Sequence, residues 1–140
     1  MPAAASGSAP GAKTPLFSED AQFWFETQRA FGAAEYGGSL FGEVLAAASA
    51  IKPGDYDSWY EAWNSMADRI AKEGAGQLSR NHRVSARDSF LRAASYYQCS
   101  EFFLHGQPGD PRIARAYRLS VDSYKQSAKL HDPLDRKSVV

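Results

Sequence analysis

The sequence lacks the short motifs that mark most catalytic centres. It contains no Gly-x-Ser-x-Gly nucleophile elbow, no phosphate-cradling glycine loop and no Cys-x-x-Cys pair. The 140 residues therefore do not hold a complete serine hydrolase site, a P-loop or a dithiol redox centre. We expect a helical domain that covers a substrate or binds a partner, and we assign no catalytic residue, no metal ligand and no cofactor.

Cysteine is almost absent. The single cysteine, Cys99, cannot form an internal disulfide, which suits a reducing compartment. It lies within an apolar pattern of helical spacing, so we interpret it as a small buried hydrophobic residue. A nucleophilic role would need a nearby base, which the sequence does not identify.

Net charge is also absent, because 16 Lys and Arg residues balance 16 Asp and Glu residues. The chain as a whole therefore has no electrostatic attraction to nucleic acid or to an anionic membrane. No apolar run is long enough to cross a bilayer, and there is neither a secretory signal nor a transit peptide. We expect a cytoplasmic protein with no nucleic-acid or membrane partner.

The composition divides the chain into three parts. Residues 1–15 are mostly Ala, Gly, Ser and Pro, which cannot bury enough apolar surface to become ordered, and we predict a flexible arm. Residues 16–131 carry helical patterns and form one predicted domain. Residues 132–140 show no regular pattern, and we interpret them as a tail or the start of a linker.

Five helices are predicted in residues 16–131, separated by turns rich in glycine and proline. The first follows a cap at Ser18 and ends near Ala34, and the third begins after a cap at Asp57 or Ser58, with an interruption at Gly74 or Gly76. Strict apolar and polar alternation is scarce, so the fold class is all-α, an irregular bundle. A tetratricopeptide-like repeat remains an alternative, although no 34-residue signature recurs. The other three helices are predicted at residues 41–50, 84–104 and 112–130.

The fourth predicted helix is apolar around most of its circumference. One apolar stripe follows its helical period, and Leu91, Ala94 and Phe102 lie on a neighbouring face. Asp88 and Arg92 are four residues apart in the order that favours an ion pair. We therefore place this helix in the middle of the bundle. The stripe comprises Ala86, Phe90, Ala93, Tyr97 and Leu104.

Aromatic residues are plentiful, and some of them are candidates for a binding site. Trp59, Trp63, Tyr96 and Tyr97 have flat rings with one polar edge, which both stack on a ligand and orient it. Arg87 adds a charge to this candidate set. The alternative interpretation of the four aromatic residues is ordinary core packing.

Two charged groups could also carry chemistry. Glu101 and His105 are one helical turn apart, close enough for both to touch a metal ion, but two ligands do not complete a site, and an ion pair at a helix end is the simpler interpretation. His82 and Arg87 cluster with Asp88 near the start of the fourth helix. Capping and ion pairing explain this second group equally well.

The order of several motifs resembles a known family. It is similar to the N-terminal helical region of α/β-hydrolases that include the 2,6-dihydroxypseudooxynicotine hydrolase, esterase-like proteins and fungal pigment-pathway hydrolases that shorten polyketides. The resemblance covers about residues 17–130. The segments that carry it are Tyr36-Gly37-Gly38 with Gly42-Glu43, Pro53-Gly54-Asp55 leading to Trp59 and Trp63, Ser85-Ala86-Arg87-Asp88, Leu91-Arg92-Ala93, Tyr96-Tyr97 and Glu101-Phe102-Phe103-Leu104.

The resemblance implies a helical cap packed over an α/β-hydrolase core, shaping a pocket for an apolar or aromatic small molecule and contributing to dimer contacts. Family members hydrolyse ester or carbon-carbon bonds with a serine, an acid and a histidine from the core, which would follow Val140. None of His82, His105 and His131 matches that histidine. The expected partner is accordingly the catalytic core or a second copy of the chain.

Two alternatives to the cap stay open. The first is a stand-alone helical protein-interaction module. The second is an independent enzyme that uses Glu101, His105 or Cys99.

Overall fold

The computed structural model describes residues 16, 17 and 19–131, which form five α-helices and two short 3-10 helices. No strand occurs among these residues, so the predicted all-α fold is confirmed. The predicted flexible arm at 1–15 and tail at 132–140 lie outside the described residues. In chain order the elements are α1 (Ala21–Gly32), η1 (Ala33–Tyr36), α2 (Phe41–Ser49), α3 (Tyr56–Ser79), α4 (Arg83–Glu101), η2 (Phe102–Gly106) and α5 (Pro111–Lys129).

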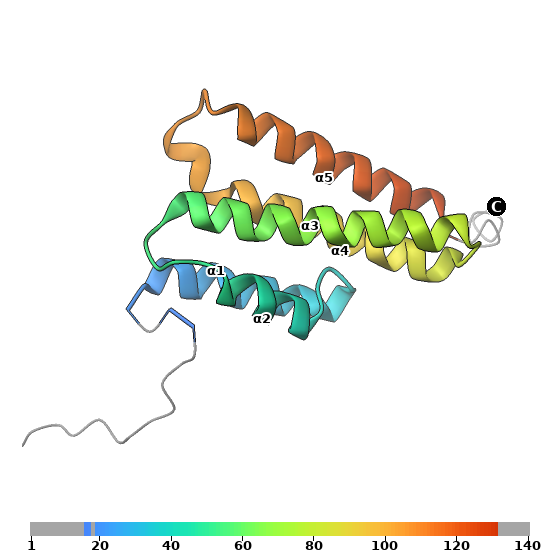
Figure 1. The fold of residues 1–140 in the computed structure, drawn as a ribbon, viewed down its shortest axis with the longest axis horizontal. Helices are drawn as coiled ribbons and strands as arrows, with labels where there is room; N and C mark the ends of the chain where they lie inside the picture. The colour runs from blue at the N-terminus through green and yellow to red at the C-terminus, as the bar shows by residue number, and fades with distance from the viewer. Residues whose placement is uncertain (1–15, 18, 132–140) are drawn as a thin grey trace, which may run out of the picture.

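The three long helices form the body of the molecule. In Figure 1, α5 runs above α3, the α1–α2 layer lies below α3, and α4 lies behind α3. Helix α4 packs against α3 and α5 and also touches α1, which confirms its predicted central place. Every residue of the apolar stripe predicted for the fourth helix is buried. Each neighbouring helix covers a different part of the circumference of α4.

The helix starts differ from the predictions. Asp20, and not Ser18, caps α1: its Oδ1 accepts from the backbone nitrogen of Phe23 at 3.1 Å, while its Oδ2 accepts from that of Gly54 at 2.8 Å. Asp55 caps α3, because its Oδ1 accepts from the backbone nitrogen of Ser58 at 3.0 Å. The predicted caps at Asp57 and Ser58 are therefore wrong, and so is the predicted start of the first helix.

The predicted interruption of the third helix is also wrong. Helix α3 runs without a break through Gly74 and Gly76. A Cβ atom at Gly74 would lie 3.3 Å from the Phe90 ring and from the Ser89 Cβ, so this glycine lets α3 and α4 approach closely. At the end of the fourth predicted helix, the α-helix stops at Glu101 and continues as the 3-10 helix η2.

The turn after α1 depends on glycine. Gly37 has φ +81°, a left-handed conformation that is costly for residues with a Cβ. Beside it, a Cβ at Gly38 would come within 2.8 Å of the Ser95 Oγ. The segment thus reverses direction and packs directly on α4.

Candidate binding surface

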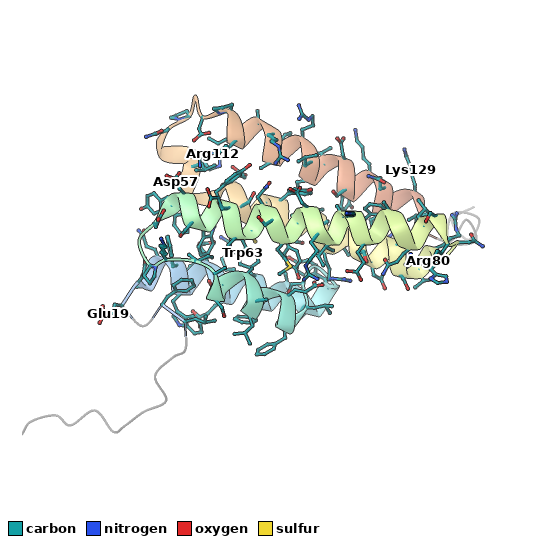
Figure 2. All side chains as sticks on the ribbon, in the orientation of Figure 1. Glu19, Asp57, Trp63, Arg80, Arg112 and Lys129 are labelled. Carbon is teal, nitrogen blue, oxygen red and sulfur yellow. The ribbon has the colours of Figure 1, made fainter. Side chains whose placement is uncertain are left out.

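Four predicted site residues meet in the hydrophobic core between α3 and α4. The ring centroids of Trp59 and Trp63 are 5.9 Å apart, and those of Trp63 and Tyr96 are 5.7 Å apart. The Trp59 indole donates from Nε1 to the Cys99 carbonyl at 2.8 Å. Figure 2 shows Trp63 on α3, facing the α1–α2 layer. None of the four, Trp59, Trp63, Tyr96 and Tyr97, is more than 3% exposed.

The two tyrosines act as hydrogen-bond donors inside this core. Tyr96 donates to Glu43 Oε1 at 2.7 Å, and Tyr97 donates to Asp68 Oδ1 at 2.5 Å. Burial raises the pKa of both hydroxyl groups, and the neighbouring carboxylate adds to the shift in each case. Both hydroxyls are therefore protonated at neutral pH. Core packing accounts for all four aromatic residues, and three of them also have a hydrogen bond from the polar edge of the ring. Their contact with a substrate stays a prediction.

Arg87 does not join the aromatic group. It lies in the first part of α4, where its Nε is 3.1 Å from Asp88 Oδ1 in an exposed pair. The predicted pair of Asp88 with Arg92 is wrong, because Arg92 turns to Glu43 on α2. His82, the third member of the predicted cluster, immediately precedes α4 and makes no side-chain cap.

Glu101 and His105 form an ion pair across the junction of α4 and η2. Among residues 16, 17 and 19–131, no three metal-ligating side chains come together. Cys99 is partly buried and packs against the core, where desolvation raises the pKa of its thiol to about 12. Its sulfur is therefore protonated at neutral pH, unlike that of an activated nucleophile.

A buried ionic network on α4 escaped sequence analysis. Arg92 donates to Glu43 Oε1 from Nε at 2.8 Å, and the two side chains are only 12% and 13% exposed. The Tyr96 hydroxyl donates to the same Glu43 oxygen and accepts from the backbone nitrogen of Leu40 at 3.0 Å. The network fixes the start of α2 against the middle of α4. Glu43 is too far in sequence from Arg92 and Tyr96 for any local spacing rule to pair them.

A second ionic cluster fixes α5 against α3. Arg112 donates from Nη1 to Asp57 Oδ1 at 2.8 Å and from Nη2 to Asp110 Oδ2 at 2.7 Å. These hydrogen bonds hold the pKa of the Asp110 carboxyl below its usual value. Figure 2 shows Arg112 next to Asp57 at the end of the bundle where both helices begin. The cluster positions α5 as one wall of the surface described next.

One side of α4 carries none of the other α-helices and is only partly covered, by the Gly37–Gly38 turn beside Leu91 and Ser95. Leu91, Ser95 and Gln98 on α4 and Phe102, the first residue of η2, follow one another at intervals of four and three residues, so they share a side of the continuous helix. They lie opposite Ala93, whose side packs on α3. We call these four residues the open face of α4.

Three hollows follow this open face. The first, of about 650 Å³, lies between α4 and α5, the second, of about 260 Å³, reaches η1 and α1, and the third, of about 360 Å³, lies beside the start of α1. Tyr36 and Gln98 line both the first and the second, and Phe102 lines both the second and the third. The hollows therefore form one continuous surface.

Large apolar side chains are exposed along this surface. Ten large hydrophobic residues of the described chain are exposed, and half of them line the three hollows. Phe25 on α1 belongs to this group. The five are Phe25 at 60%, Tyr36 at 70%, Phe102 at 41%, Tyr117 at 67% and Tyr124 at 60% exposure.

Comparison with known proteins gives relatives of one kind. The chain is 37% identical over 110 residues to "Hydrolase acrC" of Aspergillus aculeatus and to "20-hydroxy-prefusarin hydrolase FUS2" of Gibberella moniliformis, in each case across 79% of this chain and 26% of the relative. It is 33% identical over 116 residues to "Alpha/beta hydrolase xenA" of Xenoacremonium sinensis, across 83% of this chain and 27% of the relative. The chain is homologous to a part of fungal hydrolases. No family model matches it, and no solved structure matches it significantly.

The match covers most of this chain but only a small part of each relative. The chain spans about a quarter of the length of the curated relatives that it matches. The comparisons thus support a segment of an α/β-hydrolase, and they leave its role within such an enzyme to be inferred. A separate observation concerns membranes: no helix within residues 16, 17 and 19–131 is both long and apolar enough to cross one.

Proposed function

We propose that the chain is the helical cap of a serine α/β-hydrolase, which encloses a mostly apolar or aromatic substrate and is inactive alone. One observation carries this proposal. About four fifths of the chain match a segment that makes up only about a quarter of each hydrolase, and helices are the only regular secondary structure in the described residues.

The architecture of α/β-hydrolases gives the physical reason. Their core is a mostly parallel sheet, and ligands bind outside the carboxyl ends of its strands. A segment of five helices with no strand among its described residues cannot supply that sheet. It must pack outside the sheet, and a helical layer over the strand ends would close the substrate pocket and exclude water.

The chemistry is divided accordingly. The core would supply the serine, the acid and the histidine for hydrolysis of an ester or carbon-carbon bond, and we assign none of these roles to this chain. Its own contribution would be an apolar wall. The exposed aromatic side chains beside the open face of α4 are suited to that role, because they offer contact area to a ligand with little loss of side-chain freedom.

A chimera tests the proposal. In FUS2, the segment that matches this chain is replaced by residues 16–131, and hydrolysis of 20-hydroxy-prefusarin is measured. We expect the chimera to retain activity, FUS2 without the segment to lose it, and the 140-residue chain alone to show none. Full activity of FUS2 without the segment would refute the cap role.

The exposed aromatic side chains also favour one alternative, a stand-alone helical module that binds another protein. In that case the chain folds and binds a protein unrelated to hydrolases. The chimera separates the two functions, because a module of this kind would not restore hydrolysis to FUS2.

A further inference from the structure

We infer that the open face of α4, with its flanking tyrosines, is the surface that docks onto the catalytic core of the hydrolase. This inference rests on the proposed cap function and adds which side of the bundle meets the core. The first step concerns α4 itself. Ala93 and Tyr97 pack on the side of α3, and Ser120 on α5 donates to the Ala94 carbonyl at 2.9 Å, so two sides of α4 are taken.

A third side of α4 is held by the α1–α2 layer, through the bond between Arg92 and Glu43. The fourth side, with Leu91, Ser95 and Gln98, has no α-helix of residues 16, 17 and 19–131 upon it. Only the Gly37–Gly38 turn reaches its first half, where a Cβ at Gly38 would lie 2.8 Å from the Ser95 Oγ. Neither Ser95 nor Gln98 makes a side-chain hydrogen bond within residues 16, 17 and 19–131. A central helix whose remaining side carries unpaired polar groups between exposed aromatic rings is typical of a surface that another structure completes.

Most charged side chains around the open face have a partner, and Lys125 in the first hollow is the exception among the described residues. Arg29 Nη1 lies 3.2 Å from Glu26 Oε2, and Glu101 pairs with His105. The Arg29 guanidinium also lies over the Phe102 ring, 6.0 Å from its centroid. With Lys125 as its one cation outside these pairs, the described surface complements a largely neutral, apolar partner surface and offers no basic patch for a polyanion.

The length of the relatives is the reason to choose the catalytic core as the occupant. Outside the matched segment the relatives hold about three times its length, and several are named α/β-hydrolases. The part of such an enzyme outside this segment must contact it over a sizeable area. The open face joins three hollows and half of the exposed large apolar side chains into one surface, whereas the other exposed apolar residues line none of these hollows.

Two positions of equal exposure provide a matched test. Tyr117 on the surface is 67% exposed, and Phe41 at the start of α2 is 68% exposed. Figure 1 shows α5 and α2 on opposite sides of α3. Tyr117→Cys and Phe41→Cys are each placed in the chain and in the FUS2 chimera, and the rate of maleimide labelling is measured. Cys99 is only partly buried and lines the second hollow, so both variants are made in a Cys99→Ala background.

In the isolated chain we expect both variants to be labelled at similar rates. In the chimera, labelling of Tyr117→Cys should slow at least tenfold, while labelling of Phe41→Cys stays within twofold. Equal labelling of both variants in an active chimera would overturn the docking surface and leave the cap function standing. Protection of Phe41→Cys alone would overturn it as well.

Other occupants give different results. Protection of Tyr117→Cys that grows with concentration of the isolated chain would mean that a second copy covers the surface, and protection that requires added substrate would mean that the surface only contacts the ligand. Either result overturns docking onto the core. If the chimera does not fold, the same pair of aligned positions is tested in unaltered FUS2, where rapid labelling at the position of Tyr117 counts against the inference. Loss of the cap function itself is read separately, from the hydrolysis of 20-hydroxy-prefusarin.

Discussion

Arg92 and Glu43 form an ion pair that joins the middle of α4 to the start of α2, with Arg92 Nε 2.8 Å from Glu43 Oε1. Both side chains are nearly buried, and Tyr96 donates to the same carboxylate oxygen. Burying such a pair costs desolvation free energy, and removing only one partner costs more, because the other charge is then left unpaired in a poorly solvated place.

Removing the arginine side chain should therefore destabilise the fold. We expect Arg92→Ala to lower the free energy of unfolding by about 3 kcal/mol, since Glu43 keeps only the Tyr96 hydroxyl as a side-chain partner. The matched control is Arg87→Ala, on the same helix in an exposed pair with Asp88, where we expect a loss of about 0.5 kcal/mol. Urea unfolding followed by circular dichroism measures both. Equal losses in the two variants would contradict the structural role of the Arg92 pair.

The turn before α2 gives a second prediction. Gly37→Ala should cost about 1 kcal/mol, because its φ of +81° is unfavourable for a residue with a Cβ, while the added methyl group would meet only Leu91 Cδ2 at an ordinary 3.6 Å. Gly42→Ala, within α2 and with open space around it, should instead stabilise the fold by about 0.5 kcal/mol. Thermal unfolding of the two variants gives the comparison. A stabilising Gly37→Ala would show that the backbone does not adopt this conformation.

The helical pattern in the sequence predicted the buried positions of the helices well and the ends of the helices less well. The buried residues of α4 recur at intervals of three and four, so Ala86 and Ala93 could be assigned to the core from sequence alone. The caps could not, since several residues able to cap a helix stand close together. Asp20 is favoured over its neighbours because its second oxygen also binds the backbone of Gly54, a contact that only the folded chain creates.

The candidate surface was harder to foresee for a similar reason. Tyr36, Tyr117 and Tyr124 come from two distant elements, and nothing in the sequence distinguishes an exposed tyrosine from a buried one such as Tyr97. Local spacing suggested a partner for Arg92 four residues away, but the structure supplies Glu43 from another helix. Non-local pairing of this kind leaves no periodic signal.

The two core tryptophans should respond differently to loss of the indole nitrogen. Trp59 Nε1 donates to the Cys99 carbonyl at 2.8 Å, whereas Trp63 Nε1 is buried without a partner among the described residues. Both Trp→Phe changes remove similar packing, but only Trp59→Phe also removes a hydrogen bond. We expect Trp59→Phe to cost about 1 kcal/mol more than Trp63→Phe in urea unfolding. The reverse order would mean that the Trp63 nitrogen has a partner and that Trp59 gains nothing from its bond.

Stability should fall at alkaline pH, and Cys99 should account for the first part of that fall. Desolvation raises the pKa of its thiol from 9.0 to about 12 in the folded chain. Above pH 9 the unfolded chain loses this proton while the folded chain keeps it, so the unfolded state is favoured progressively until the pH reaches the folded pKa. The contribution of the Cys99 thiol to the free energy of unfolding is fully present below pH 9. Above that pH, each further pH unit lowers the free energy of unfolding by at most about 1.4 kcal/mol. The raised pKa values of Tyr96 and Tyr97 act in the same direction above pH 10.

The free energy of unfolding is measured between pH 8 and pH 10 for the natural chain and for Cys99→Ala. The variant should lose less stability over that interval, and parallel pH profiles would show that the Cys99 thiol ionises equally easily in the folded and unfolded states.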